Sequence, residues 1–249
     1  MFDLSGKNAL VTGASGAIGS AIAFALAEAG ADIACHFNSN RDSAEKLADS
    51  IRKLGRKACV VQANLTKSGE CDTLVDNVVD ELGEIHILVN NAGVNRESLL
   101  FRESPDEITG VLEANLASMI YMSKAVGRRM AKERWGRLIH IGSVIAHSGF
   151  SGVSVYAASK AGIEGMSRAL ARELGHRNVT SNVLAPGFID VGMTESMSEG
   201  LQTRLMQYIA LGRKGTAREI AAAAVYLASE EAGYVTGAVL HVNGGLQML

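Results

Sequence analysis

The segment that decides the fold is Thr12-Gly13-Ala14-Ser15-Gly16-Ala17-Ile18-Gly19, which begins where the apolar run Ala9 to Thr12 ends. The run predicts a buried strand, and Ile18, Ile22 and Leu26 then recur on one face of a helix. Glycines between a strand and a helix let the backbone turn sharply and approach a phosphate, whose charge is stabilised at the helix N-terminus. The segment therefore predicts a dinucleotide-binding turn, with an ordinary strand-to-helix turn as the alternative.

The same alternation of strand and helix continues to the end of the chain. Further strands are predicted at Ile33 to Phe37, Ala58 to Gln62, Ile85 to Asn90, Leu138 to Ile141, Thr180 to Leu184 and Val239 to Val242. These runs are apolar almost throughout, which is typical of strands buried on both faces of a parallel sheet. Capping boxes at Ser104 to Glu107 and Thr216 to Glu219, and an apolar stripe from Cys71 to Leu82, predict helices between the strands.

These patterns predict one fold class for the whole chain. We expect an α/β protein, a single-domain Rossmann-type doubly wound parallel sheet of about seven strands with helices on both faces, over residues 1–249. The 27 glycines have no period and hydrophobic residues make up 47% of the chain, which excludes collagen-like and low-complexity sequences.

Charge and composition also exclude several kinds of partner. The net charge of −2 gives no basic field for nucleic acid, and the longest apolar run, Ile220 to Ala228, is too short to span a membrane. Because the first residues have no basic segment followed by an apolar one, we expect no secretory signal. Cys35, Cys59 and Cys71 form no Cys-x-x-Cys pair, so we expect buried thiols in a reducing, cytoplasmic compartment. The six histidines have no metal-binding spacing, and no metal site is expected.

A second motif carries the chemistry. Tyr156-Ala157-Ala158-Ser159-Lys160 places a phenol and an ammonium at i and i+4, on one face of a helix. Ser143 follows the strand Leu138 to Ile141, Asn90-Asn91-Ala92-Gly93 ends the fourth strand, and Asn115 lies in the helix after it. Taken singly, these are a turn serine, a helix amide and a packing tyrosine. Together we expect them near the carboxyl edge of the sheet, where ligands of open α/β folds bind.

In order and spacing these motifs resemble the short-chain dehydrogenase/reductase family over essentially the whole chain, and within it the 3-oxoacyl-acyl carrier protein reductases of fatty acid synthesis. The resemblance implies an oxidoreductase in which Tyr156 gives a proton to the substrate oxygen and Ser143 holds that oxygen. Lys160 would favour the Tyr156 phenolate and grip the nicotinamide ribose. Asn115 would order water between Lys160 and solvent.

The resemblance also implies the residues that hold the cofactor. They are Gly13, Ser15, Gly16, Ile18, Gly19, Asn38, Asn64, Leu65, Asn91, Ala92, Gly93, Tyr156, Lys160, Pro186, Gly187 and Ile189. Two positions depart from the family pattern, Ala17 in place of a glycine and Val191 in place of a threonine. Gly16 stands where many NADP-using members carry arginine.

The end of the second strand bears on which cofactor binds. Phe37-Asn38-Ser39-Asn40-Arg41 has donors and a cation but no carboxylate, whereas an acid there binds the ribose hydroxyls of NAD and repels a 2′-phosphate. We expect NADP (NADPH), with NAD as the weaker alternative.

The expected reaction is NADPH-dependent reduction of a 3-oxoacyl thioester of acyl carrier protein or CoA. The substrate wall would come from Val144 to Val155 and from a lid around residues 190–211. The resemblance implies a homotetramer and a carrier-facing surface at Arg134 and Arg177. The alternatives are a short-chain dehydrogenase acting on another alcohol or ketone, such as a polyol, sugar acid or hydroxyacyl-CoA, and a non-catalytic dinucleotide-binding sensor.

Overall fold

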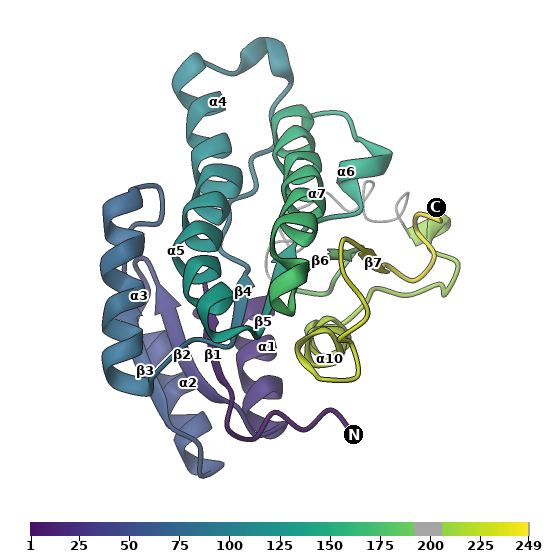
Figure 1. The fold of residues 1–249 in the computed structure, drawn as a ribbon. Helices are drawn as coiled ribbons and strands as arrows, with labels where there is room; N and C mark the ends of the chain where they lie inside the picture. The colour runs from purple at the N-terminus through teal and green to yellow at the C-terminus, as the bar shows by residue number, and fades with distance from the viewer. Residues whose placement is uncertain (192–205, 249) are drawn as a thin grey trace.

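The described chain folds into a parallel sheet enclosed between two layers of helices (Figure 1). The computed structural model describes residues 1–191 and 206–248. Among these residues the sheet has seven strands in the order β3-β2-β1-β4-β5-β6-β7, all paired in parallel. The strands are β1 (Asn8–Val11), β2 (Asp32–Phe37), β3 (Ala58–Gln62), β4 (Ile87–Asn90), β5 (Gly136–Ile141), β6 (Val179–Pro186) and β7 (Val239–Val242). The predicted fold class is confirmed.

Helices connect the strands and cover both faces of the sheet. The α-helices are α1 (Ala17–Glu28), α2 (Arg41–Lys53), α3 (Ser68–Leu82), α4 (Pro105–Leu112), α5 (Ser118–Glu133), α6 (Ile145–Ser148), α7 (Ser154–Leu174) and α10 (Ala217–Ala228). Two 3₁₀ turns, η1 (Leu100–Arg102) and η3 (Gly175–Arg177), and a π-helical turn, η2 (Glu113–Ala117), complete the described elements. Both predicted capping boxes are present, at the starts of α4 and α10.

All seven predicted strands are found, but several ends differ. β4 starts two residues later than predicted, at Ile87, whereas β5 begins two residues earlier, at Gly136. β6 extends to Pro186, whose missing N–H is tolerated at the end of a strand. The apolar runs therefore locate the strands, but the pairing extends past a run at Gly136 and Pro186 and starts inside one at Ile87.

The two helix layers bury separate parts of the core. On one face α1, α2 and α10 pack against strand residues through side chains such as Ile22, Ile51 and Ile220. On the other face α3 and α5 do the same through side chains such as Leu74 and Met122. No helix among the described residues is long and apolar enough to cross a membrane.

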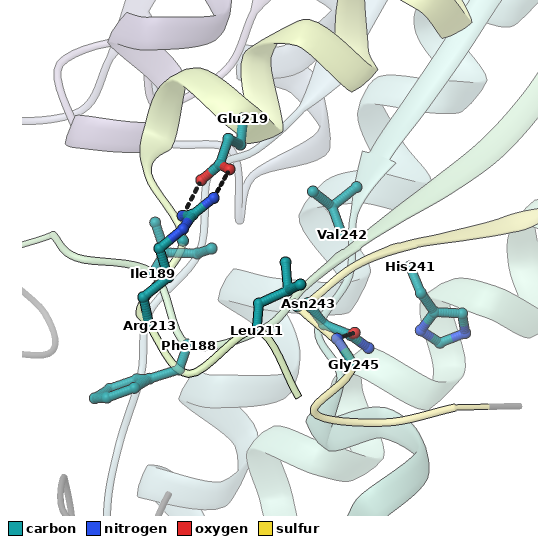
Figure 2. A pocket seen from close by; sticks show the side chains of 11 residues that line it. Phe188, Ile189, Leu211, Arg213, Glu219, His241, Val242, Asn243 and Gly245 are labelled. Atoms are coloured by element: carbon teal, nitrogen blue, oxygen red, sulfur yellow. Dashed lines mark hydrogen bonds and ion pairs between the residues drawn. The ribbon is translucent and has the colours of Figure 1, made fainter. Parts of the chain in front are cut away.

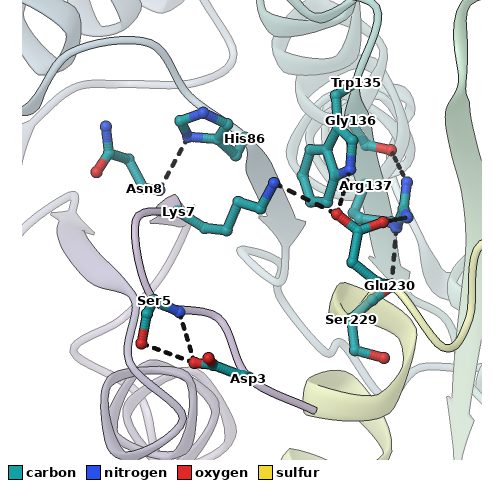
Figure 3. Close-up of polar contacts among 10 residues, drawn as sticks. All are labelled: Asp3, Ser5, Lys7, Asn8, His86, Trp135, Gly136, Arg137, Ser229 and Glu230. Carbon is teal, nitrogen blue, oxygen red and sulfur yellow. Dashed lines mark hydrogen bonds and ion pairs between the residues drawn. The ribbon is translucent and has the colours of Figure 1, made fainter. Parts of the chain in front are cut away.

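One polar cluster stabilises the amino-terminal edge of the sheet (Figure 3). Arg137 at the start of β5 is fully buried and donates to Ser229 O at 3.2 Å, with Glu230 Oε2 at 3.5 Å from its guanidinium. The ring of Trp135 lies between Lys7 Nζ, 3.7 Å from its centroid, and the Arg137 guanidinium, at 4.3 Å. A buried cation needs such partners, and here they join β5 to the end of α10 at the edge away from Ser143.

The opposite edge of the sheet is where a ligand site is expected. The chain leaves β1 toward β2 on one side, whereas β4 pairs with β1 on the other side. This reversal of strand order opens a crevice at the carboxyl ends of the strands. The turns after β1, β4, β5 and β6 all lie at that edge.

Candidate active site

The turn after β1 is bonded to the segment after β4. The Thr12 hydroxyl oxygen accepts hydrogen bonds from the backbone N–H groups of Asn91 and Ala92, at 2.9 and 3.0 Å. The Asn91 side-chain amide donates to Thr12 O at 2.9 Å and to Gly13 O at 3.2 Å. Gly13 has a left-handed φ of +64°, which glycine adopts without strain. These hydrogen bonds hold the turn after β1 against the segment after β4, so that the two form one wall of the candidate site.

The glycines of this turn have unequal roles. A Cβ on Gly19 would lie 2.4 Å from Gly13 O and 2.6 Å from Asn91 Nδ2, so only glycine allows α1 to approach the turn. A Cβ on Gly16 would lie 3.5 Å from Gly13 O, an ordinary contact. Ala17 is the first residue of α1, in ordinary helical conformation, so the backbone needs no glycine there.

The N-terminus of α1 faces this turn without a capping group. Gly16 is the N-cap residue, no side chain caps the helix, and its first turn has no acidic residue. Backbone N–H groups at such an end attract an anion. The arrangement therefore fits a pyrophosphate.

Ser143, Tyr156 and Lys160 come together at the end of β5. Ser143 follows the strand by two residues, while Tyr156 and Lys160 lie on consecutive turns of α7. The Lys160 ammonium donates to Ile141 O at 2.8 Å and is 5.6 Å from the centroid of the Tyr156 ring. The structure thus brings together three of the four residues that the sequence analysis predicted to be catalytic.

Asn115 lies behind this group, in the π-helical turn η2 rather than in a regular α-helix. Its side-chain oxygen accepts from Val94 N at 2.7 Å, and its amide donates to Val94 O at 2.9 Å and to Ser159 Oγ at 3.2 Å. A Cβ on Gly93 would lie 2.9 Å from Asn115 Oδ1, so the glycine at this position leaves room for the Asn115 side-chain amide. The fully buried side chain joins the segment after β4 to α7, next to Lys160.

Burial sets the ionisation of the two titratable groups. It lowers the pKa of Lys160 to about 8. It also raises the pKa of Tyr156, with the Ser143 hydroxyl acting in the opposite direction. The expected preference for the Tyr156 phenolate is not found, because removal of the phenol from water disfavours its anion more strongly. Tyr156 is therefore protonated at neutral pH.

A cavity of about 570 Å³ connects the α1 turn with Ser143. It is lined by every residue predicted to hold the cofactor, namely Gly13, Ser15, Gly16, Ile18, Gly19, Asn38, Asn64, Leu65, Asn91, Ala92, Gly93, Tyr156, Lys160, Pro186, Gly187 and Ile189. Ser143 lines it too, whereas Asn115 does not. The described lining contains no Asp or Glu, and Lys160 is its one charged residue. Such a cavity suits a polyanionic ligand.

His36 on β2 is a cavity residue that the sequence did not predict. Gly13 N donates to its Nδ1 at 3.0 Å, and its Nε2 lies 3.1 Å from Ala63 O. Burial lowers the pKa of His36, so the ring is neutral and carries its hydrogen on Nε2. It joins the β1 turn to the segment after β3. A lone polar residue in the apolar run from Ile33 to Phe37 was the available signal.

Other polar residues near the cavity are already engaged. Arg41 is exposed on α2, 3.4 Å from Glu45, and does not line the cavity. Asn64 Oδ1 accepts from the backbone and the hydroxyl of Thr66, at 3.1 and 2.8 Å. Of the residues after β2, Asn38 and Ser39 line the cavity.

A second, smaller cavity of about 220 Å³ is lined by residues from the Phe188–Ile189 turn, the start of α10 and the end of β7 (Figure 2). Arg213 in its wall forms two contacts with the Glu219 carboxylate, at 3.0 and 2.6 Å, so its charge is already paired. Of the predicted lid, residues 192–205 lie outside the described residues. No cluster of three or more His, Cys, Asp or Glu side chains suited to a metal ion occurs in the part of the chain that is described.

Comparison with known proteins agrees with this geometry. The family model described as "Enoyl-(Acyl carrier protein) reductase" matches residues 13–247. The 3-oxoacyl-[acyl-carrier-protein] reductase of Salmonella typhimurium is 45% identical over 98% of both chains. That of Escherichia coli is 44% identical over 99% of this chain and 100% of its own length.

Solved structures show the same fold. A double mutant of a Serratia marcescens short-chain dehydrogenase/reductase is 35% identical, with a TM-score of 0.92 over 98% of this chain and 99% of its own. A dehydrogenase/reductase from Sinorhizobium meliloti 1021 is 31% identical, with a TM-score of 0.94 over 99% of this chain and 97% of its own. Sequence, fold and site agree, and the chain belongs to the short-chain dehydrogenase/reductase family.

Proposed function

We propose that this protein reduces a 3-oxoacyl thioester, held by acyl carrier protein or CoA, to the 3-hydroxyacyl thioester with NADPH. The observation that carries the proposal is the meeting of Ser143, Tyr156 and Lys160 at one end of a cavity that otherwise suits a dinucleotide. Relatives named as 3-oxoacyl-acyl carrier protein reductases match nearly the whole chain, which supports the substrate class. We further propose that residues 1–249 form one domain, with residues 190–211 as its substrate lid.

Membership of this family implies a nicotinamide dinucleotide, and the cavity fits one. The close approach at Gly19 and the uncapped N-terminus of α1 provide a pyrophosphate cradle. Asn38 and Ser39 offer donors, and the described lining has no carboxylate to repel a 2′-phosphate. This supports NADPH as the reductant, without the contribution first expected from Arg41.

The residues have separate roles in the proposed reaction. Bound NADPH supplies the hydride, and negative charge then develops on the carbonyl oxygen. The hydroxyls of Ser143 and Tyr156 donate hydrogen bonds to that oxygen, and Tyr156 transfers its proton. The Lys160 ammonium stabilises the phenolate left behind and binds the ribose hydroxyls. Asn115 holds the segment after β4 against α7 and so fixes this arrangement.

A substrate and cofactor panel tests the proposal. We expect turnover of acetoacetyl thioesters with NADPH, at least about tenfold faster than with NADH, because hydrogen bonds from Asn38 and Ser39 to the charged 2′-phosphate are together worth more than about 1.4 kcal/mol. Rates are measured by NADPH absorbance, with polyols, sugar acids and a 2-enoyl thioester as comparison substrates. Faster turnover of any comparison substrate would contradict the proposed substrate class, and NADPH binding without any turnover would favour the sensor.

The residues proposed to face the carrier lie far from Ser143 of the same protomer. Arg134 follows α5 with a φ of +56°, and Arg177 is in η3. They precede β5 and β6, whose first residues, Gly136 and Val179, are paired. Ser143 follows the other end of β5, which at ~3.3 Å per residue is roughly 20 Å away. We propose that the protein assembles as a homotetramer in which a carrier bound at these arginines serves the active site of another subunit.

Charge reversal tests this carrier surface. The double variant Arg134→Glu/Arg177→Glu is expected to raise KM for the carrier-bound substrate at least about tenfold, because like charges replace an attraction to an acidic carrier. KM for the CoA substrate should stay within about twofold. Lys46→Glu/Lys53→Glu makes the same charge change on α2 and serves as the control. Equal effects of both double variants, or equal losses on both substrates, would refute the surface.

A further inference from the structure

Three titratable side chains meet beside the active site without lining its cavity. His147 on α6, Glu164 on α7 and His241 on β7 come from separate elements. His147 Nε2 is 2.7 Å from Glu164 Oε1, and the rings of His147 and His241 are 5.2 Å apart. Arg168 lies 3.6 Å from the other Glu164 oxygen but is 57% exposed. The proposed reaction uses none of these groups.

The short helix α6 sets the position of Ser143. The Ile145 N–H donates to Ser143 Oγ at 3.2 Å, which leaves the serine O–H able to donate to a substrate. Before α6, the chain is bonded to β6 through Gly142 N to Leu184 O, at 2.7 Å, and continues as Val144 N to Pro186 O, at 3.0 Å. The amino end of α6 is therefore anchored on the sheet.

The far end of α6 has little such support. Gly149 and Gly152, with φ of +59° and +83°, form the connection to α7, and added Cβ atoms would meet nothing nearer than 3.9 Å. The backbone at His147 faces solvent, whereas its side chain is only 24% exposed and reaches Glu164. The connection itself is held at Gly152, whose O accepts from Ser98 N at 2.8 Å, and the contact of His147 with Glu164 joins the end of α6 to α7.

Glu164 lies on the same helix as Tyr156 and Lys160, so a contact to Glu164 can fix the position of α6 relative to these two residues. It lies one turn beyond Lys160 and two turns beyond Tyr156 on the same helix. Its side chain is 5% exposed, and a buried carboxylate requires a partner to offset lost hydration. The contact between His147 and Glu164 therefore fixes the position of α6 relative to α7, the helix that carries Tyr156.

We propose that His147 is a positioning residue. Through its contact with Glu164, it holds Ser143 where the Ser143 and Tyr156 hydroxyls can both reach the substrate oxygen. The proposal rests on the function proposed above. A small misplacement of a hydrogen-bond donor lowers turnover without altering the cofactor cradle. The competing explanation is that His147 only neutralises a buried carboxylate, in which case its loss would affect stability alone.

The test compares His147→Ala with His147→Gln, whose amide can donate a hydrogen bond to the nearby Glu164 oxygen, each with Ser143 intact and with Ser143→Ala. We expect His147→Ala to lower kcat for acetoacetyl thioester about five- to tenfold. His147→Gln should retain at least about half of kcat, because its amide can contact the same Glu164 oxygen. In the Ser143→Ala background, His147→Ala should change kcat less than about twofold, since the residue acts through Ser143.

Cofactor affinity and hydrogen exchange distinguish the positioning role of His147 from a purely structural one. The Kd for NADPH, from fluorescence titration, should stay within about twofold in all variants. Hydrogen exchange of residues 143–148 should accelerate at least about tenfold in His147→Ala and recover in His147→Gln, and this needs no substrate. Equal kcat losses in both serine backgrounds, or unchanged exchange, would overturn the positioning role. A wild-type protein that shows protected exchange but reduces no 3-oxoacyl thioester would refute the proposed function instead.

Discussion

Tyr156→Phe is expected to lower kcat for ketone reduction about 10²- to 10⁴-fold, the usual contribution of a positioned proton donor. The substitution removes one oxygen and keeps the ring that packs beside Lys160. Burial raises the pKa of Tyr156, so the wild-type phenol is protonated and ready to donate at neutral pH. Lys160, with a pKa of about 8, is then largely an ammonium and stabilises the phenolate formed by the transfer.

The loss should be confined to the chemical step. The Kd for NADPH is expected to stay within about threefold, because most of the cavity wall is unchanged. Tyr226→Phe removes a hydroxyl from α10, where the ring packs against Phe2, and is the matched control with an unchanged kcat. Comparable turnover by Tyr156→Phe and wild type would eliminate the proposed mechanism.

Local pattern is enough to predict the framework of this protein. Runs such as Ile87–Asn90 are buried along their whole length, so their apolar character identified them as strands of a parallel sheet. The capping boxes at Ser104 and Thr216 locate helix starts because the side-chain bonds span only three residues. Both signals are local, and both are confirmed.

Features that depend on distant residues were not predictable in this way. The bond from Asn91 N to Thr12 Oγ1 joins positions 79 residues apart, and no spacing indicates it. His36 entered the site through two partners on other segments, Gly13 and Ala63. The pKa of Tyr156 is shifted upward, whereas the sequence led us to expect a downward shift. Burial causes this shift, and the depth of burial is a property of the whole fold.

Gly19→Ala is expected to weaken NADPH binding at least about 100-fold, because charge-assisted hydrogen bonds from the helix N-terminus to the pyrophosphate would be lost. The added methyl would lie 2.4 Å from Gly13 O and 2.6 Å from Asn91 Nδ2. Neither neighbour can move independently, since Asn91 donates to Thr12 O and Gly13 O and so holds both segments together. The helix must therefore shift away from the turn, which withdraws its N-terminal N–H groups from the pyrophosphate. Overpacking of this kind also costs about 1–3 kcal/mol of stability.

Gly16→Ala is the matched control for this effect, because it adds the same methyl three residues earlier in the same turn. Its Cβ would meet Gly13 O at 3.5 Å, and Gly16 has a φ of −87°, which alanine adopts readily. The Kd for NADPH should therefore rise less than about threefold, with a small loss of helix capping. The Kd of both variants is measured by NADPH fluorescence titration, and their melting temperatures are measured as well. The two measurements distinguish a loss of affinity caused by displacement of α1 from one caused by general destabilisation. Equal loss of affinity in the two variants would mean that any side chain in the turn obstructs the ligand directly, and that the packing of α1 on the Gly13 carbonyl is not what forms the site.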